Sequence, residues 1–262
     1  MYYSRWWKIS AMGLALWLTA APGYAQQSST AASPLEEKAM STLMKAAEFL
    51  AKAQRFSVTA DIGYDVVQDS GQKLEFGAGR TITVKRPDRI SVDIVDRDGT
   101  KRGFRFDGKH IAFFGLDEKV YATAEKTGDL DAAFAYFTQD LQMPLPMGEL
   151  FTNNLPKGLK DQFSEAYYVE ESTLGGVPCD HLALRNDMTD AQVWITKGDK
   201  PLLHRLVITY KRKNGQPEFR ADFHDWNFSA EAPDSLFTFT PAEGAARIQF
   251  VAAMRPKTTE GQ

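Results

Sequence analysis

Residues that build common catalytic and metal sites are scarce or isolated in this sequence. Its single cysteine, Cys179, cannot form a disulfide within the chain. The four histidines stand apart, without the paired spacing of a zinc site. No Gly-x-Ser-x-Gly motif occurs, and Gly77-Ala78-Gly79 lies between strand-like residues rather than at a strand-to-helix turn that could hold phosphate. We therefore expect no metal, no cofactor and no enzymatic activity.

Positive charge is also scarce. The sequence has 31 Lys and Arg residues against 34 Asp and Glu residues, a formal net charge of −3. Removing a leader that contains Arg5 and Lys8 but no acidic residue would lower this charge by two, from −3 to −5. Because neutralising phosphates requires a basic face, nucleic acid is not an expected partner.

Cys179-Asp180-His181 is the triplet that invites a catalytic interpretation. Strand residues at i and i+2 point to the same side, but a thiol and its base also need a third group that orients the base. The sequence favours a buried and inert cysteine. An exposed redox thiol is the alternative.

The first 25 residues have the pattern of a signal peptide. Two basic residues precede the apolar run 9–21, and a small-x-small cleavage pattern ends at Ala25. The run is short for a membrane span, which leaves an uncleaved anchor as the alternative. No cysteine lies near Gln26, so lipidation is not expected. We expect cleavage after Ala25, export, and a flexible spacer over 26–32.

The longest amphipathic stretch predicts a hairpin over 56–84. Apolar residues alternate with polar ones on both arms, and Asp69-Ser70-Gly71 forms the turn. The apolar face must lie against the protein's own core or against a ligand. The hairpin residues expected to line a hydrophobic cavity are Val58, Ala60, Ile62, Tyr64, Leu74, Phe76, Ile82 and Val84.

Two helices are predicted as well. Ser33-Pro34-Leu35-Glu36 indicates a helix start with Ser33 as its N-cap. Asp129 can cap a central helix whose apolar residues recur at helical spacing. This central helix is either a plug that fills the core or a mobile lid. Its expected cavity residues are Phe134 and Phe137.

The remaining segments read as short strands separated by turns, which with the two arms of the hairpin makes ten or eleven strands. No helix interrupts the strands that follow the hairpin, so an antiparallel meander is expected. The fold class is mainly β with helices (α+β), arranged as a barrel or a sandwich.

The order of motifs carries a resemblance. It runs from Arg86-Pro87-Asp88-Arg89 through a Pro-Leu-Pro segment and Gly175-Gly176-Val177-Pro178-Cys179-Asp180-His181 to Asp225-Trp226 and Phe239-x-Pro241. This string resembles an uncharacterised family of predicted periplasmic proteins of Gram-negative bacteria. That family is similar to the lipoprotein carrier LolA, its receptor LolB and the envelope-stress regulator RseB.

The resemblance implies an incomplete antiparallel β-barrel, a LolA-like half-barrel with an N-terminal helix and a central helical lid or plug. One such domain is expected over 33–252, followed by a flexible tail over 253–262. The function implied is a soluble, monomeric periplasmic protein that binds or carries a lipid or the acyl chain of a lipoprotein. The alternative is an envelope module that contacts a protein partner or senses stress, without a small-molecule ligand.

Overall fold

The computed structural model describes residues 36–141, 145 and 147–250. The expected signal peptide with its cleavage site, the spacer and the C-terminal tail lie outside the described residues. Every element below belongs to the second of two compact units of the chain, which begins at Ala32.

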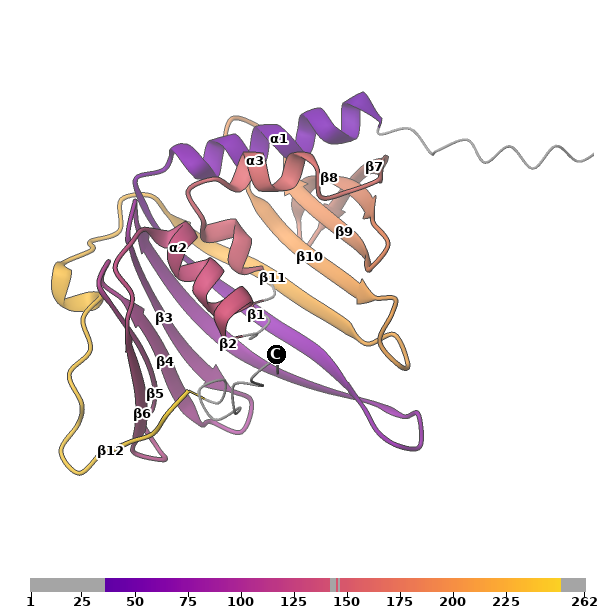
Figure 1. The fold of residues 1–262 in the computed structure, drawn as a ribbon. Helices are drawn as coiled ribbons and strands as arrows, with labels where there is room; N and C mark the ends of the chain where they lie inside the picture. Colours follow the sequence, from indigo (N-terminus) through magenta and orange to yellow (C-terminus); the bar gives the residue numbers. More distant parts are fainter. Residues whose placement is uncertain (1–35, 142–144, 146, 251–262) are drawn as a thin grey trace, which may run out of the picture. The chain divides into compact units, whose positions relative to one another are not determined.

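One large sheet dominates the described residues (Figure 1). All neighbouring strands are antiparallel, except that β12 runs parallel to β6. The spatial order is β12-β6-β5-β4-β3-β2-β1-β11-β10-β9-β8-β7. The strands are β1 (Arg55–Val67), β2 (Lys73–Lys85), β3 (Arg89–Asp96), β4 (Lys101–Phe106), β5 (His110–Gly115), β6 (Val120–Glu125), β7 (Glu165–Leu174), β8 (Val177–Arg185), β9 (Thr189–Thr196), β10 (Leu203–Tyr210), β11 (Glu218–Asn227) and β12 (Ala246–Arg247).

The sheet consists of two meanders, β1 to β6 and β7 to β11, which join where β11 pairs with β1. The expected hairpin is therefore the centre of the sheet and not its edge. Residues of the predicted apolar parity share one face, and Val58, Ala60, Ile62, Ile82 and Val84 are all buried there. We call this the inner face. The sheet stays open, and the expected half-barrel is confirmed.

Helix α1 (Glu37–Lys52) lies across the inner face and buries its apolar stripe against it (Figure 1). Its N-cap is Glu36, without a side-chain capping bond, and the expected N-cap at Ser33 falls outside the described residues. The Glu36 carboxylate instead accepts a hydrogen bond of 2.6 Å from the backbone N–H of Tyr168 in β7. This bond ties the start of α1 to the sheet edge.

The central segment is less regular than the expected helix. Asp129 caps α2 (Leu130–Ala135) as expected, since its carboxylate accepts from the Ala132 N–H at 2.9 Å. The helix then widens into a π turn, Tyr136–Asp140, which rotates later side chains away from simple α-helical spacing. A 3₁₀ turn (Gly148–Phe151) and α3 (Leu155–Lys160) follow. None of the described helices is long and apolar enough to cross a membrane.

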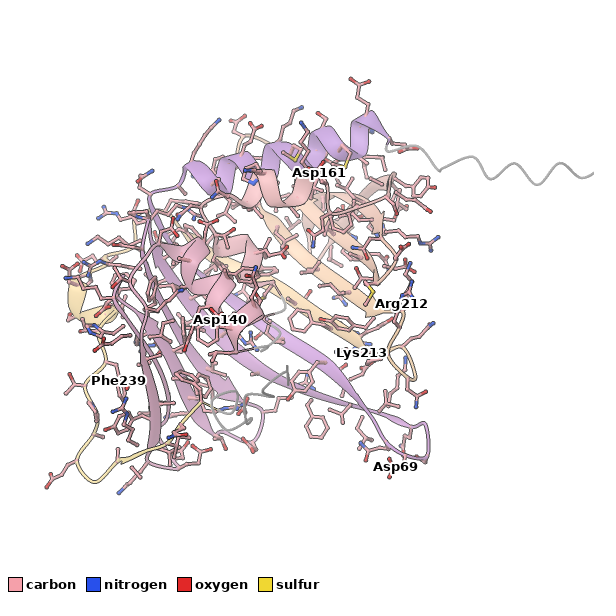
Figure 2. All side chains as sticks on the ribbon, viewed as in Figure 1. Asp69, Asp140, Asp161, Arg212, Lys213 and Phe239 are labelled. Carbon is pink, nitrogen blue, oxygen red and sulfur yellow. The ribbon has the colours of Figure 1, made fainter. Side chains whose placement is uncertain are left out.

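Figure 2 labels side chains at several edges of the described structure. Asp69 marks the tip of the β1–β2 hairpin, away from the helices, and Arg212 with Lys213 marks the tip between β10 and β11. Phe239 covers the outer face, where its ring stacks on that of Phe114 at 4.8 Å. On the inner face toward the tip of the β1–β2 hairpin, Tyr64 is 39% and Phe76 47% exposed, so the helices cover only part of that face.

Candidate functional site

Two apolar cavities lie between the helical segments and the inner face of the sheet. The larger, of about 370 Å³, lies between the α2 region and strands β1 to β5. Six of its lining residues are Ile82, Ile90, Val92, Phe104, Phe134 and Phe137. The smaller, of about 270 Å³, lies between α1, α3 and strands β8 to β10, with Leu43, Ala47, Ala191 and Leu206 among its walls.

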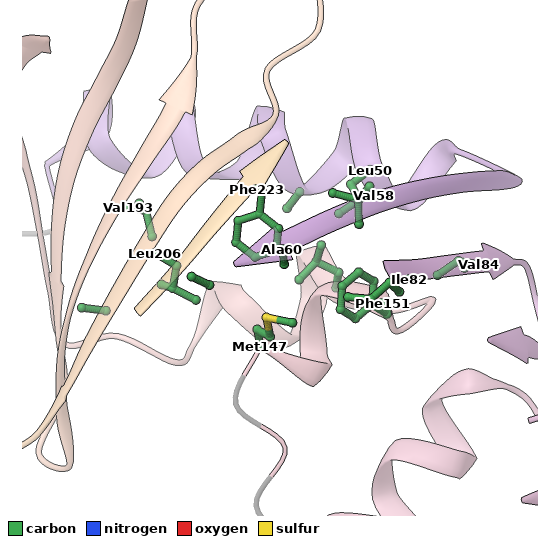
Figure 3. Close-up of a cluster of buried hydrophobic side chains, with 14 of the residues drawn as sticks. Leu50, Val58, Ala60, Ile82, Val84, Met147, Phe151, Val193, Leu206 and Phe223 are labelled. Atoms are coloured by element: carbon green, nitrogen blue, oxygen red, sulfur yellow. The ribbon is translucent and has the colours of Figure 1, made fainter. Parts of the chain in front are cut away.

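Met147 separates the two cavities. It lines both of them, as does Leu145, and it is buried. Figure 3 shows its side chain between Phe151 and Ile82 on one side and Leu206 and Val193 on the other. Its backbone is left-handed, with φ 61°, which is a strained conformation for a residue other than glycine. The local fold holds this side chain between the cavities despite the strain.

The structure places the ten sequence-predicted cavity residues in three groups. Tyr64, Ile82, Phe134 and Phe137 line the larger cavity. Val58, Ala60, Ile62 and Val84 are buried in the hydrophobic core. Leu74 and Phe76 lie on the distal part of the hairpin, where Phe76 is 47% exposed and its ring stacks on Tyr64 at 6.1 Å. Their role in ligand binding stays a prediction.

The central segment fills the inner face only in part. Phe137 is buried, and its ring packs edge-on against Phe104 of β4 at 5.2 Å. The larger cavity therefore has Phe134 and Phe137 on one wall and Tyr64 and Ile82 on another. The segment therefore packs on Phe104 and leaves a cavity between itself and strands β1 to β5.

Three charged residues line the larger cavity that the sequence reasoning did not select: Arg80, Asp96 and Arg102. Arg102 forms an ion pair with Asp96. Burial lowers the pKa of Arg80, and so does the charge of Arg102, while Asp96 and Tyr64 act in the opposite direction. The signal for Arg80 is present in the sequence, because it has the same parity as Ala78 and Ile82 in an otherwise apolar row.

Arg86 connects the helical segments to the sheet beside the larger cavity, at the turn between β2 and β3. Its Nη1 donates to the carbonyls of Phe151 at 3.0 Å and Thr152 at 2.8 Å, and to Asn153 Oδ1 at 3.1 Å. Burial lowers the pKa of Arg86, and Asp131 opposes this effect. Asp131 in turn accepts from the backbone N–H of Asn153 at 2.8 Å. Arg86 thus fixes the end of the 3₁₀ turn to the turn between β2 and β3.

Cys179 and His181 have separate surroundings. The thiol is fully buried, and burial together with Asp180 raises its pKa, the opposite of an activated thiolate. The His181 ring stacks on Trp194 at 4.1 Å, and its Nε2 lies 3.1 Å from Gln192 Oε1. Both residues therefore have structural contacts. Within the described residues, no cluster of three metal-binding side chains occurs.

Comparison with solved structures gives matches of low sequence identity. An uncharacterised conserved protein from Thermus thermophilus is 8% identical, with 81% of this chain and 99% of that chain covered and a TM-score of 0.48. The lipoprotein LppX from Mycobacterium tuberculosis is 10% identical, with 75% and 98% covered and a TM-score of 0.45. A LolA superfamily protein from Nitrosomonas europaea is 14% identical, with 77% and 97% covered and a TM-score of 0.40.

The family comparison is more decisive. No curated protein gives a significant match. The family model described as predicted periplasmic protein (DUF2092) matches residues 39–251, which is most of the chain. This match agrees with the periplasmic family that the order of motifs resembles. The chain therefore belongs to the DUF2092 family of predicted periplasmic proteins.

Proposed function

We propose that this protein is a periplasmic binding or carrier protein whose larger cavity holds a hydrophobic ligand, such as a lipid or the acyl chain of a lipoprotein. The observation that carries the proposal is the cavity of about 370 Å³ left between the helical segments and the sheet. Its walls include the rings of Phe104, Phe134 and Phe137 and the side chains of Ile82 and Val92. Such walls favour a hydrocarbon occupant.

The walls of the cavity support an occupant. The cavity is partly open to solvent, and its walls are mainly apolar. Removing apolar surface from water gains about 25 cal/mol per Å². Water gains little from such walls, so a hydrocarbon chain is the occupant that gains most free energy by filling the cavity.

Replacing Ala133 with leucine should block ligand binding without unfolding the protein. Ala133 is buried in α2 and lines the larger cavity, so the added carbons occupy the space meant for the ligand. Leucine is also a good helix former. In wild type, dodecanoate at a hundredfold excess over its Kd should stabilise the fold by about 2.7 kcal/mol. The unfolding midpoint then rises by about 5 to 10 °C, and Ala133→Leu should lose this rise.

The matched control is Ala191→Leu, which adds the same atoms to the smaller cavity. It should keep the dodecanoate-dependent rise in the unfolding midpoint. Loss of the rise in Ala191→Leu alone would assign the ligand to the smaller cavity. No stabilisation of wild type by any lipid or amphiphile would contradict the proposed function, and a stoichiometric protein captured from periplasmic extract would then favour an interaction module.

A further inference from the structure

Arg80 occupies an unusual place on the inner face of the sheet. Strand register pairs it with Ala60 on one side and with Ile94 on the other, and the same row continues to Phe223 and Arg102. Cross-strand partners share a face. The guanidinium group therefore belongs to the wall of the larger cavity, among apolar neighbours.

The charge of Arg80 has no partner among the described residues. No ion pair or side-chain hydrogen bond is formed by its guanidinium within residues 36–141, 145 and 147–250, and its Nε is buried without an acceptor. Arg102, the nearby cation, is already matched by Asp96. The two arginines and one carboxylate thus leave one positive charge uncompensated. A charge held among apolar side chains without a partner is unfavourable, and an anionic group on a ligand in this cavity would supply its counter-charge.

The cavity has a polar end and an apolar end. Tyr64, Asp96 and Arg102 line the end toward the hairpin tip, where Tyr64 is 39% exposed. Ile90, Leu130 and Phe151 line the opposite end, beside the turn that Arg86 fixes. From Ile94, beside Arg80, to Ile90 is four residues of strand, or about 13 Å. A medium-length hydrocarbon chain therefore fits between Arg80 and the apolar end.

We propose that Arg80 binds the anionic group of the ligand, a carboxylate or a phosphate, while the attached hydrocarbon chain extends toward Ile90 and Phe151. The inference rests on the proposed function and specifies its ligand class as an anionic amphiphile. Arginine suits this role because its planar guanidinium can donate two parallel hydrogen bonds to either anion. Arg102 and Asp96 stay paired and contribute no net charge.

The test compares ligands that share a twelve-carbon chain and differ in the head group. Dodecanoate, dodecyl phosphate, dodecanol and dodecyltrimethylammonium are titrated below their micelle concentrations against the full mature chain, with inorganic phosphate as the chain-free anion. The variants are Arg80→Met, which keeps an unbranched side chain, and Arg97→Met. Arg97 lies on the outer face at the same end of the sheet, paired with Glu75 at 2.7 Å.

Wild type and Arg97→Met should bind the two anionic amphiphiles at least about tenfold more tightly than dodecanol, the effect of one charge-assisted hydrogen bond. Arg80→Met should bind dodecanoate, dodecyl phosphate and dodecanol with affinities within about twofold of one another, and its affinity for dodecanol should equal that of wild type. Inorganic phosphate alone should bind at least about a hundredfold more weakly than dodecyl phosphate, because it lacks the chain. Ligand-free Arg80→Met should also unfold a few degrees higher than wild type, since a partly buried charge without a partner among the described residues is gone.

Each contrary result has its own meaning. An anion preference that survives in Arg80→Met, or an Arg80→Met variant that does not fold, overturns the assignment of Arg80 and leaves the proposed function intact. Equal affinity for inorganic phosphate and dodecyl phosphate overturns the assignment of the ligand as an amphiphile and indicates a site for a free anion. Failure of all four twelve-carbon compounds to bind wild type overturns the proposed function itself.

Discussion

Replacing Arg86 with methionine should lower the free energy of unfolding by about 3 kcal/mol, the range for breaking a buried charged contact. Its Nη1 satisfies the carbonyls of Phe151 and Thr152 and the side chain of Asn153, all at 3.1 Å or less. Methionine offers no donor, so the two buried carbonyls lose their side-chain partner. Removal of the Arg86 charge itself recovers part of the loss, because its Nε and Nη2 have no partners among the described residues.

The effect of Arg86→Met should concentrate at the 3₁₀ turn. Chemical denaturation gives the change in stability. Amide hydrogen exchange should show a larger increase in exchange rate over wild type at Leu150 and Thr152 than in β9 or β10. Arg86→Lys is the matched variant. It keeps the charge but lacks the planar group that contacts three acceptors, so about half of the loss should remain. Wild-type stability in Arg86→Met would contradict the assignment of Arg86 as the link between helices and sheet.

Replacing Phe56 with alanine should lower the free energy of unfolding by about 3 to 5 kcal/mol. The Phe56 ring is fully buried at the start of β1, between the end of β11 and the 3₁₀ turn. Its neighbours are the rings of Trp226 at 5.7 Å, Phe228 at 6.0 Å and Phe151 at 6.4 Å. Alanine leaves a cavity that these rings cannot all close, because Trp226 and Phe228 are held at the end of β11 and Phe151 is held in the 3₁₀ turn.

Phe76→Ala is the control for Phe56→Ala. Phe76 belongs to the same hairpin and the same face, but it is 47% exposed and its aromatic neighbour is Tyr64. Its loss should cost about 1 kcal/mol, the worth of one exposed aromatic pair. Urea denaturation of both variants measures the difference. Equal losses would show that burial along the hairpin does not decide its contribution to the core.

Much of the fold could be predicted from local patterns. The alternation over 56–84 placed Val58, Ile62 and Ile82 on a buried face, and that face is the centre of the core. Asp129 was identified as an N-cap because a short acidic side chain precedes an apolar run. The pairing of β11 with β1 could not be predicted, since it joins residues more than 150 positions apart and depends on how the two meanders meet.

The candidate site was less accessible from the sequence. Parity identified the inner face but not where the helices would leave space on it, so Ala60 and Val84 proved to be core while Tyr64 and Ile82 line the cavity. Helical spacing from Leu130 already places Phe137 on the apolar face, whereas the widening into a π turn over Tyr136–Asp140 has no signal in that spacing. Arg80 could have been selected as a charge within an apolar row. Its lack of a partner among the described residues, however, becomes visible only once the register across β1 to β4 is known.

The central claim is that the larger cavity holds an anionic amphiphile. Native mass spectrometry of the protein purified from the periplasm, beside Ala133→Leu and Ala191→Leu prepared in the same way, tests it most directly. Wild type and Ala191→Leu should each carry one bound amphiphile that organic extraction releases as a carboxylate or a phosphate, and Ala133→Leu should carry none. Wild type at its ligand-free mass, or Ala133→Leu with the same bound mass as wild type, would contradict the account.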